Sequence, residues 1–296
     1  MVERAYVVDI AVEDVDVAAR TFEQILGIEP LITDHYDPSG QMQQRHFAVG
    51  GLNAIGLQSV PTNGPTARNY VARRLLKRGE GAYLIGFLVN DVAERQAALE
   101  EQGVEFAMRE PVSYEAGRMT MTRPFNDTVV EFAEHNTPDE TAKWQALAKA
   151  ATGRRVRRAY IVDLAIEDLG AARATFEKAL GAAAVPAADV AEPLPGDGVV
   201  IPTDGLYAVG LTELGPLADA RVRPDGEGVY CVGFVVDDLD ATQHHLEQLG
   251  IGLLYDQPRE HAFGRLNITR PVHGVLLQFS QHDPSAAERW RSLAGR

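Results

Sequence analysis

The sequence predicts an α+β protein made of four tandem βαβββ modules, two in each half of the 296-residue chain. One observation is a long internal repeat. RAYVVDIAVEDVDVAARTFEQILG at Arg4–Gly27 returns as RAYIVDLAIEDLGAARATFEKALG at Arg158–Gly181, with 14 identities in 24 positions. The other is that strand-type and helix-type patterns follow one another in the same order twice within each half. We therefore expect two domains, each with a curled mixed sheet around a cleft.

The first module opens with a β-branched, apolar stretch that is typical of a buried strand. Apolar residues at helical spacing follow and stop at Gly27, which suits a helix C-cap. Two further strand-like runs flank Gly50 and Gly51, and this pattern predicts a hairpin. The predicted elements are a strand at Tyr6–Val12, a helix at Val15–Leu26, and hairpin strands at His46–Val49 and Ala54–Val60.

The second module repeats this order, with a helix that ends at Gly103 and two strands around Asn126 and Asp127. An amphipathic helix and a basic, glycine-containing linker then lead to the second copy. The predicted elements are a strand at Ala82–Val89, a helix at Val92–Gln102, strands at Met119–Thr122 and Thr128–Ala133, a helix at Asp139–Ala151 and the linker Thr152–Arg157. The expected domains are residues 1–136 and 158–282, with a helix and linker at 137–157 and a C-terminal helix at 283–296.

Composition and charge exclude several classes of function. A formal charge of -14 and a sequence pI of 5.0 would repel a phosphate backbone, so nucleic acid is not expected as a partner. No apolar run approaches the roughly 20 residues of a membrane span, and the N-terminus lacks a signal-peptide pattern. We therefore expect a soluble, cytoplasmic protein with no membrane partner. The single cysteine, Cys231, lies in an apolar run, which predicts a core position.

A set of short motifs recurs in both halves with the same order and spacing. This arrangement resembles the vicinal oxygen chelate superfamily, which includes glyoxalase I, bleomycin-resistance proteins, extradiol dioxygenases and methylmalonyl-CoA epimerase, and the likeness is strongest to the epimerase. It covers nearly all of both halves and implies a glyoxalase-like fold for each. The motifs that carry the resemblance are Ile10-Ala11-Val12 with Asp14, Leu26-Gly27, KRGEG at Lys77–Gly81, Asp91-Val92, Gly103-Val104 and Val129–Phe132.

The resemblance also implies a divalent metal in the cleft, held by four side chains. In the first half the four positions are occupied by Val7, Gly56, Leu84 and Glu131, and in the second by Ile161, Gly210, Cys231 and Gln278. Only Glu131 is a usual ligand of a divalent metal, because such ions need several oxygen or nitrogen donors. We therefore expect no metal and no cofactor in either cleft. Val7, Gly56 and Leu84 become candidate substrate-contacting residues on an apolar floor.

Three residues of the first half are candidates for acid and base chemistry. Glu131 lies mid-strand in VVEFAE, where it either faces the cleft, as the resemblance implies, or belongs to a solvent-facing alternation. Asp9 lies in an apolar strand and either returns a carboxylate to the cleft or has a structural role such as pairing with Arg4. His46 lies close to the strand position from which the epimerase presents its base, and its ordinary pKa near 6.5 suits proton abstraction. A lone strand histidine is also often structural.

Further polar residues are expected near the mouth of the first cleft. Tyr114, Arg118 and His35 are candidates for substrate contact, and the guanidinium of Arg118 can clamp a carboxylate or phosphate. In the second half Val200 stands where the first half has His46, so the first half is the better candidate for chemistry.

Two functions fit these observations. The first is a metal-independent enzyme that acts on a small carbonyl-containing metabolite by proton abstraction, with isomerase, epimerase or lyase chemistry. The second is a non-catalytic protein that sequesters a hydrophobic small molecule, as bleomycin-resistance proteins do. In either case the partner is a small molecule, and the two halves form an internal pseudo-dimer that leaves further homodimerisation open.

Overall fold

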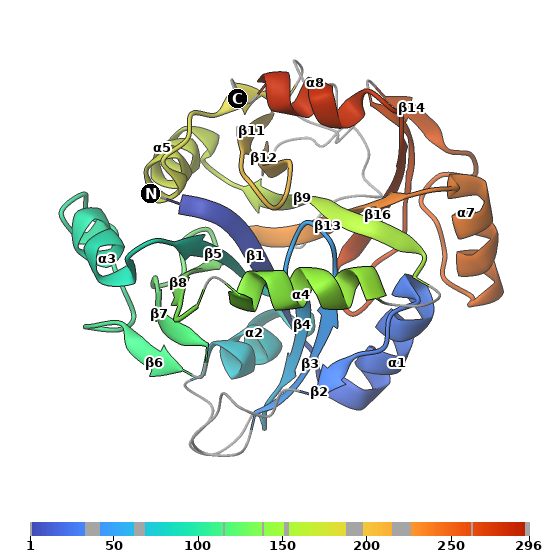
Figure 1. The fold of residues 1–296 in the computed structure, drawn as a ribbon. Coiled ribbons are helices and arrows are strands. Elements are labelled where there is room, and N and C mark those ends of the chain that lie inside the picture. Colours follow the sequence, from blue (N-terminus) through green and yellow to red (C-terminus); the bar gives the residue numbers. More distant parts are fainter. Residues whose placement is uncertain are drawn as a thin grey trace.

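The computed structural model describes residues 2–32, 42–61, 69–114, 116–137, 139–150, 154–187, 198–214, 226–261 and 263–293. It contains two curled, eight-stranded mixed sheets, one in each half (Figure 1). The elements of the first half are β1 (Val2–Ala11), α1 (Val15–Leu26), β2 (Leu31–Ile32), β3 (Gln43–Ala48), β4 (Ala54–Ser59), α2 (Tyr70–Arg78), β5 (Gly81–Val89), α3 (Val92–Glu100), β6 (Val112–Tyr114), β7 (Gly117–Met121), β8 (Val129–His135) and α4 (Asp139–Ala150). Those of the second half are β9 (Val156–Ile166), α5 (Leu169–Leu180), β10 (Val185–Pro186), β11 (Gly198–Pro202), β12 (Ala208–Glu213), β13 (Gly228–Val236), α7 (Leu239–Gln248), β14 (Arg259–His261), β15 (Gly264–Ile268), β16 (Leu276–His282) and α8 (Ala286–Leu293).

Each sheet joins two βαβββ modules along one central pair of strands. The order in the first sheet is β2-β3-β4-β1-β5-β8-β7-β6, and the second sheet has the same order with β10-β11-β12-β9-β13-β16-β15-β14. β1 runs antiparallel to β5 and parallel to β4, while β5 runs parallel to β8. The predicted α+β fold of four tandem modules is therefore confirmed.

Local sequence signals explain where the first helix starts and stops. The side chain of Asp14 caps α1 by accepting hydrogen bonds from the backbone N–H groups of Asp16 and Val17, and Gly27 ends it in a left-handed conformation with φ 68°. Helix α2 was not predicted. Its N-cap is Asn69, and it follows the hairpin in the connection where the second copy is seven residues shorter.

Alternation along β1 separates a shared core from the cleft of the first half. Val8 and Ile10 are fully buried in a hydrophobic core to which both halves contribute. Val7 and Asp9 point to the opposite face, because successive strand residues alternate. The first cleft is therefore built on the sheet face that turns away from the shared core.

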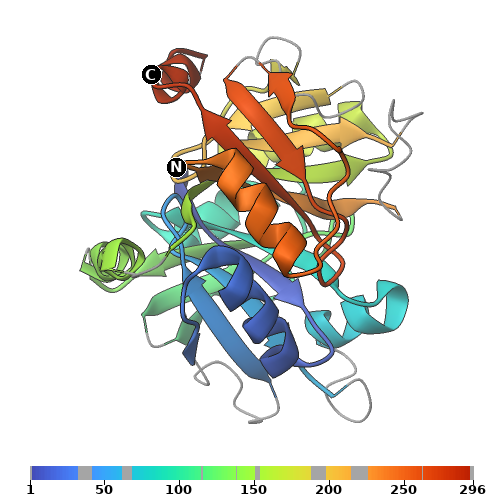
Figure 2. The ribbon, with the colours of Figure 1, turned by 90° about the vertical axis from the view of Figure 1, so that its right-hand side faces the viewer.

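Equivalent contacts join the two halves on both sides of the seam between them. The N–H of Ala5 donates to the carbonyl of Asp204 at 2.8 Å, and the N–H of Ala159 donates to the carbonyl of Gly50 at 2.7 Å. Ala159 and Asp204 are the repeat counterparts of Ala5 and Gly50, so these two bonds are related by the duplication. Figure 2 shows α1 and α7 side by side, where His245 Nε2 lies 2.9 Å from the carbonyl of Gln24. In the part of the chain that the structure describes, no helix has the length and apolar character needed to cross a membrane.

Candidate functional site

A cavity of about 850 Å³ occupies the cleft of the first half. Its walls come from the first sheet, from α2 and from α4, which runs across the sheet (Figure 1). All four methionines among the described residues line it, together with four tyrosines and one tryptophan. These residues are Met42, Met108, Met119, Met121, Tyr6, Tyr70, Tyr83, Tyr114 and Trp144.

Glu131 lies on the floor of this cavity. Strand β8 places it opposite Gly86 of β5, and it is only 6% exposed. The hydroxyl of Tyr6 donates a hydrogen bond to its Oε1. Burial raises the pKa of Glu131 from 4.5 to about 7, while the bond from Tyr6 acts in the opposite direction. A carboxyl with such a pKa can accept and release a proton near neutral pH.

Asp9 lies on the same floor at the end of a buried hydrogen-bond chain. The hydroxyl of Tyr83 donates to Gln58 Oε1 at 2.5 Å, and Gln58 Nε2 donates to Asp9 Oδ2 at 2.9 Å. Asp9 is 5% exposed, and its Oδ1 has no hydrogen-bond partner among the described residues. Burial, and then the charge of Glu131, raise the pKa of Asp9 well above its ordinary value. Burial therefore favours the neutral form of the Asp9 carboxyl.

The alternative of a pair between Asp9 and Arg4 is wrong. The guanidinium of Arg4 donates to the carbonyls of Gly51 and Ala5 at 2.9 and 3.2 Å, at the seam between the halves. The carboxyl of Asp9 instead lies over Gly56, where a Cβ atom would collide with Asp9 Oδ1. Glycine at position 56 therefore makes room for the Asp9 side chain.

His46 lies beside the same glycine and faces the cavity from β3. Its Nε2 would be 3.0 Å from a Cβ atom at Gly56, and its ring meets that of Trp144 edge-on at 6.2 Å between centroids. Desolvation lowers the pKa of His46 to about 4. The ring is therefore neutral at physiological pH and is a weaker base than Glu131.

The residues at the superfamily's four metal-ligand positions do not fit a divalent metal. Val7 and Leu84 contribute hydrocarbon to the cavity wall, and the space beside Gly56 is taken by the carboxyl of Asp9. Among the described residues, no group of three or more His, Cys, Asp or Glu side chains is arranged to hold a metal ion. Glu131 is left as the one conventional ligand of this set.

The residues expected at the mouth of the cleft differ in whether they line the cavity. Tyr114 lines the cavity, and burial raises the pKa of its hydroxyl. Arg118 does not line it, since its guanidinium pairs with Glu134 at 2.5 Å across the β7–β8 pair. This position does not support the expected clamp on a substrate by Arg118. His35 lies outside the described residues.

Several cavity residues escaped the sequence analysis. Gln58 and Tyr83 position Asp9, and Tyr6 bonds to Glu131. Asn53 is 2% exposed, lines the cavity, and has no partner for either side-chain polar atom within the described residues. Tyr6 and Tyr83 recur in the repeat as Tyr160 and Tyr230, and this repetition was the one signal that could have marked them.

Bulky side chains fill the corresponding cleft of the second half. Phe263, which replaces Ala116, is 2% exposed and stacks on Trp290 at 4.8 Å between centroids. Trp290 is itself 3% exposed and stacks on Tyr207. Gln278, the counterpart of Glu131, is fully buried. The second cleft is therefore packed as a hydrophobic core where the first is open.

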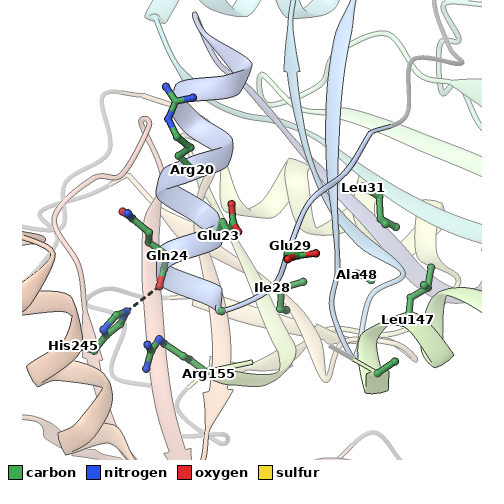
Figure 3. Close-up of a pocket in the computed structure, with 12 residues that line it drawn as sticks. Arg20, Glu23, Gln24, Ile28, Glu29, Leu31, Ala48, Leu147, Arg155 and His245 are labelled. Atoms are coloured by element: carbon green, nitrogen blue, oxygen red, sulfur yellow. Dashed lines mark hydrogen bonds between the residues drawn. The ribbon is translucent and has the colours of Figure 1, made fainter. Parts of the chain in front are cut away.

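A second cavity of about 840 Å³ lies outside the cleft, between α1, α4 and α7 (Figure 3). Leu31 and Leu147 line both cavities and so separate them. Figure 3 shows Arg20, Arg155 and His245 along one side of it, with the bond from His245 to Gln24 drawn between the halves. Its charged lining comes from exposed and half-buried side chains, unlike the buried acids of the first cavity.

Comparison with known proteins finds a family match within the first half. Residues 8–122 match the model of the glyoxalase/bleomycin resistance protein/dioxygenase superfamily. A search of curated proteins finds no match.

Solved structures share the fold over nearly the whole chain. A mutant of 4-hydroxymandelate synthase from Streptomyces coelicolor is 16% identical with a TM-score of 0.67, over 99% of this chain and 97% of that one. A xylose isomerase-like TIM barrel/4-hydroxyphenylpyruvate dioxygenase fusion protein is 15% identical with a TM-score of 0.63, over 99% of this chain and 52% of that one. Methylmalonyl-CoA epimerase from Mycobacterium tuberculosis is 25% identical over 48% of this chain and 93% of that one, with a TM-score of 0.39. At such low identities the first two likenesses describe the fold alone.

Proposed function

Because residues 8–122 match the model of the glyoxalase/bleomycin resistance protein/dioxygenase superfamily, we propose that this chain is an enzyme that moves a proton on a small carbonyl compound bound in the first cleft. One observation carries the proposal. Glu131, the single conventional ligand left at the superfamily's metal positions, lies on the floor of a large cavity with its pKa raised to about 7. A carboxyl in this state suits general acid and base catalysis.

The proposed reaction begins with the carboxylate of Glu131 taking a proton from the carbon next to the carbonyl group. The electrons of the C–H bond form a C=C bond, and those of the carbonyl double bond move to its oxygen. Hydrogen-bond donors must stabilise that oxygen, and the neutral Asp9 and the amide of Asn53 are the candidates on the cavity wall. Return of the proton to the same or a neighbouring carbon gives epimerisation or isomerisation, and loss of a group from the next carbon gives a lyase reaction.

His46 has a supporting part in this scheme. With a pKa lowered to about 4 it stays neutral, so it can orient the ligand or donate a hydrogen bond but is poorly suited to serve as the base. The acid and base pair of the scheme is therefore Glu131 and Asp9.

A second function is favoured by the methionine-rich wall. Unbranched, polarisable methionine side chains adapt to ligands of different shapes, and such walls are common in binding sites that accept several ligands. The first cleft would then sequester an apolar small molecule without turning it over, and Val7 and Leu84 would serve as its floor.

The deciding experiment follows hydrogen exchange at carbon. Aryl alkyl ketones, 1,3-diketones and 2-oxo acids are incubated in D2O with the wild-type protein, with Glu131→Gln and with Gln278→Ala, and exchange of the α-protons is read by NMR. We expect exchange of at least one compound, about 10²–10⁴-fold slower with Glu131→Gln and unchanged with Gln278→Ala. Loss of exchange in Gln278→Ala alone would show that the wrong half was chosen. Binding without any exchange would favour sequestration.

A further inference from the structure

We infer that the first cleft takes an uncharged, aromatic carbonyl compound, and that Asp9 donates a hydrogen bond to the carbonyl oxygen of this ligand. The inference rests on the proposed function of the cleft. It adds the charge and shape of the ligand and the separate role of Asp9, and three features of the described residues support it.

The first feature is the hydrogen-bond chain that fixes the proton of Asp9. Tyr83 donates to Gln58 Oε1, so the amide of Gln58 must present its Nε2 to Asp9, and Asp9 Oδ2 must accept. The proton of a neutral Asp9 carboxyl therefore belongs on Oδ1. This oxygen has no partner among the described residues, and a buried donor without a partner is unfavourable because it has lost its hydrogen bonds to water. A ligand oxygen would supply the missing acceptor.

The second feature is the charge of the cavity wall. Lys143 is the only lysine or arginine among the described residues that line the cavity, and it lies at the exposed end beside Glu140, 3.6 Å away. The floor carries two buried acids, Asp9 and Glu131. A carboxylate or phosphate bound there would be desolvated next to acidic groups with no cation to pair with, which is strongly unfavourable. An uncharged ligand avoids this cost.

The third feature is the aromatic and thioether wall. Trp144 from α4 and Tyr6 and Tyr83 from the sheet face the space between α4 and the sheet, and Met119 and Met121 lie along β7. Aromatic rings pack favourably against other rings and against methionine sulfur. A volume of about 850 Å³ leaves room for a fused two-ring or three-ring compound.

Three probes of similar size test the charge and the acceptor. They are β-acetonaphthone, an uncharged ketone, β-naphthoate, its anionic analogue, and β-isopropenylnaphthalene, which lacks the oxygen. Binding to the full-length protein is measured by calorimetry near neutral pH. We expect the ketone to bind about tenfold more tightly than the hydrocarbon, because it gains one hydrogen bond, and at least about tenfold more tightly than the anion.

Substitutions at Asp9 test the donor. Asp9→Leu should remove the preference for the ketone over the hydrocarbon. Asp9→Asn should restore it, because Gln58 would fix the amide with its NH2 group in the place of Oδ1–H. Asp163→Asn, the same change at the counterpart in the second half, is the matched control and should leave all three affinities unchanged. Circular dichroism checks that each variant is folded, and the wild-type comparison stands even if Asp9→Leu is not.

Several results would overturn the inference. One is that naphthoate binds as tightly as the ketone, and another is that the folded wild-type protein does not bind the ketone. A third is that Asp9→Asn loses the preference for the ketone, which would mean that an ionised Asp9 is needed. The readout is affinity and not turnover. A protein that binds the ketone with the expected preferences but exchanges no α-protons would therefore contradict the proposed catalysis and leave this inference standing.

Discussion

The same backbone encloses an open cavity in the first half of the chain and a packed core in the second. The strand orders of the two sheets are identical, so the difference lies in the side chains. Ala116 and Met108 border the first cavity, whereas Phe263 and Tyr255 are buried at the same positions of the second half. A few differences in side-chain volume therefore separate an open cavity from a packed core on the same backbone.

The buried polar residues on the sheets of the two halves also differ. In the first half Tyr6 donates a hydrogen bond to the carboxyl of Glu131, and in the second the amide of Gln278 donates to the hydroxyl of Tyr160. The geometry is preserved, but an amide cannot exchange a proton near neutral pH. We therefore expect chemistry in the first half and structural support from the second.

The largest difference between the halves is expected in the loss of stability when a large aromatic side chain is truncated to alanine. Phe263→Ala removes a buried ring from a stacked aromatic cluster and should lower the free energy of unfolding by about 3–5 kcal/mol. Trp144→Ala, at the partly exposed edge of the open cavity, should cost clearly less and act mainly on ligand affinity. Urea denaturation of both variants gives the comparison. Equal losses of stability would contradict a packed second cleft.

The pH dependence of stability should distinguish a glutamate at position 131 from the glutamine found at the matching position of the second half. The folded-state pKa of Glu131 is raised from 4.5 to about 7, so its neutral form is favoured in the folded protein. Wild-type stability is then fully present below pH 4.5 and falls, by up to roughly 3 kcal/mol, as the pH rises to about 7. Glu131→Gln removes this loss and should be more stable than the wild type above pH 7, with little difference at pH 4. Urea unfolding at a series of pH values tests this, and parallel curves for the two proteins would contradict a raised pKa.

A further test places the bulky side chains of the second cleft at the matching positions of the first. The double variant Met108→Tyr and Ala116→Phe should fill the cavity and weaken ligand binding by at least about a hundredfold, because the ligand loses its contact volume. Its stability should change little or rise. Calorimetry with the naphthyl probes measures the effect. Undiminished binding would mean that the ligand enters elsewhere.

The smallest effect is expected at Arg118. Its guanidinium pairs with Glu134 outside the cavity, and the matched residue Arg265 pairs with Asp240 in the second half. Arg118→Ala and Arg265→Ala should both leave probe affinity and exchange rate unchanged. A loss of affinity confined to Arg118→Ala would restore the role that the sequence suggested for this residue.

Much of the fold was accessible from the sequence because the duplication repeats each local signal. The boundaries of α1 were predicted to the residue, since Asp14 and Gly27 mark both ends. Helix α2 was missed. It lies in the connection where the second copy is shorter, so the repeat gave no second view of it.

The site was accessible only in part. Asp9 and Glu131 were identified as carboxylates within strands, and His46 was identified from the resemblance to the epimerase; all three line one cavity. The chain from Tyr83 through Gln58 to Asp9 depends on the register of three strands far apart in the sequence. Whether a cleft is open depends on how side-chain volumes pack together, as at Phe263 and Trp290, and local patterns do not report this.

A crystal structure of the full chain soaked with β-acetonaphthone tests the central claim most directly. The account predicts one ligand in the first cleft, between Trp144 and the floor formed by Asp9 and Glu131, with its oxygen within hydrogen-bond distance of Asp9 Oδ1. Phe263 and Trp290 should remain stacked and in contact with no ligand. A ligand seated in the second half, or one in the first cleft with its oxygen turned away from both acids, would contradict it.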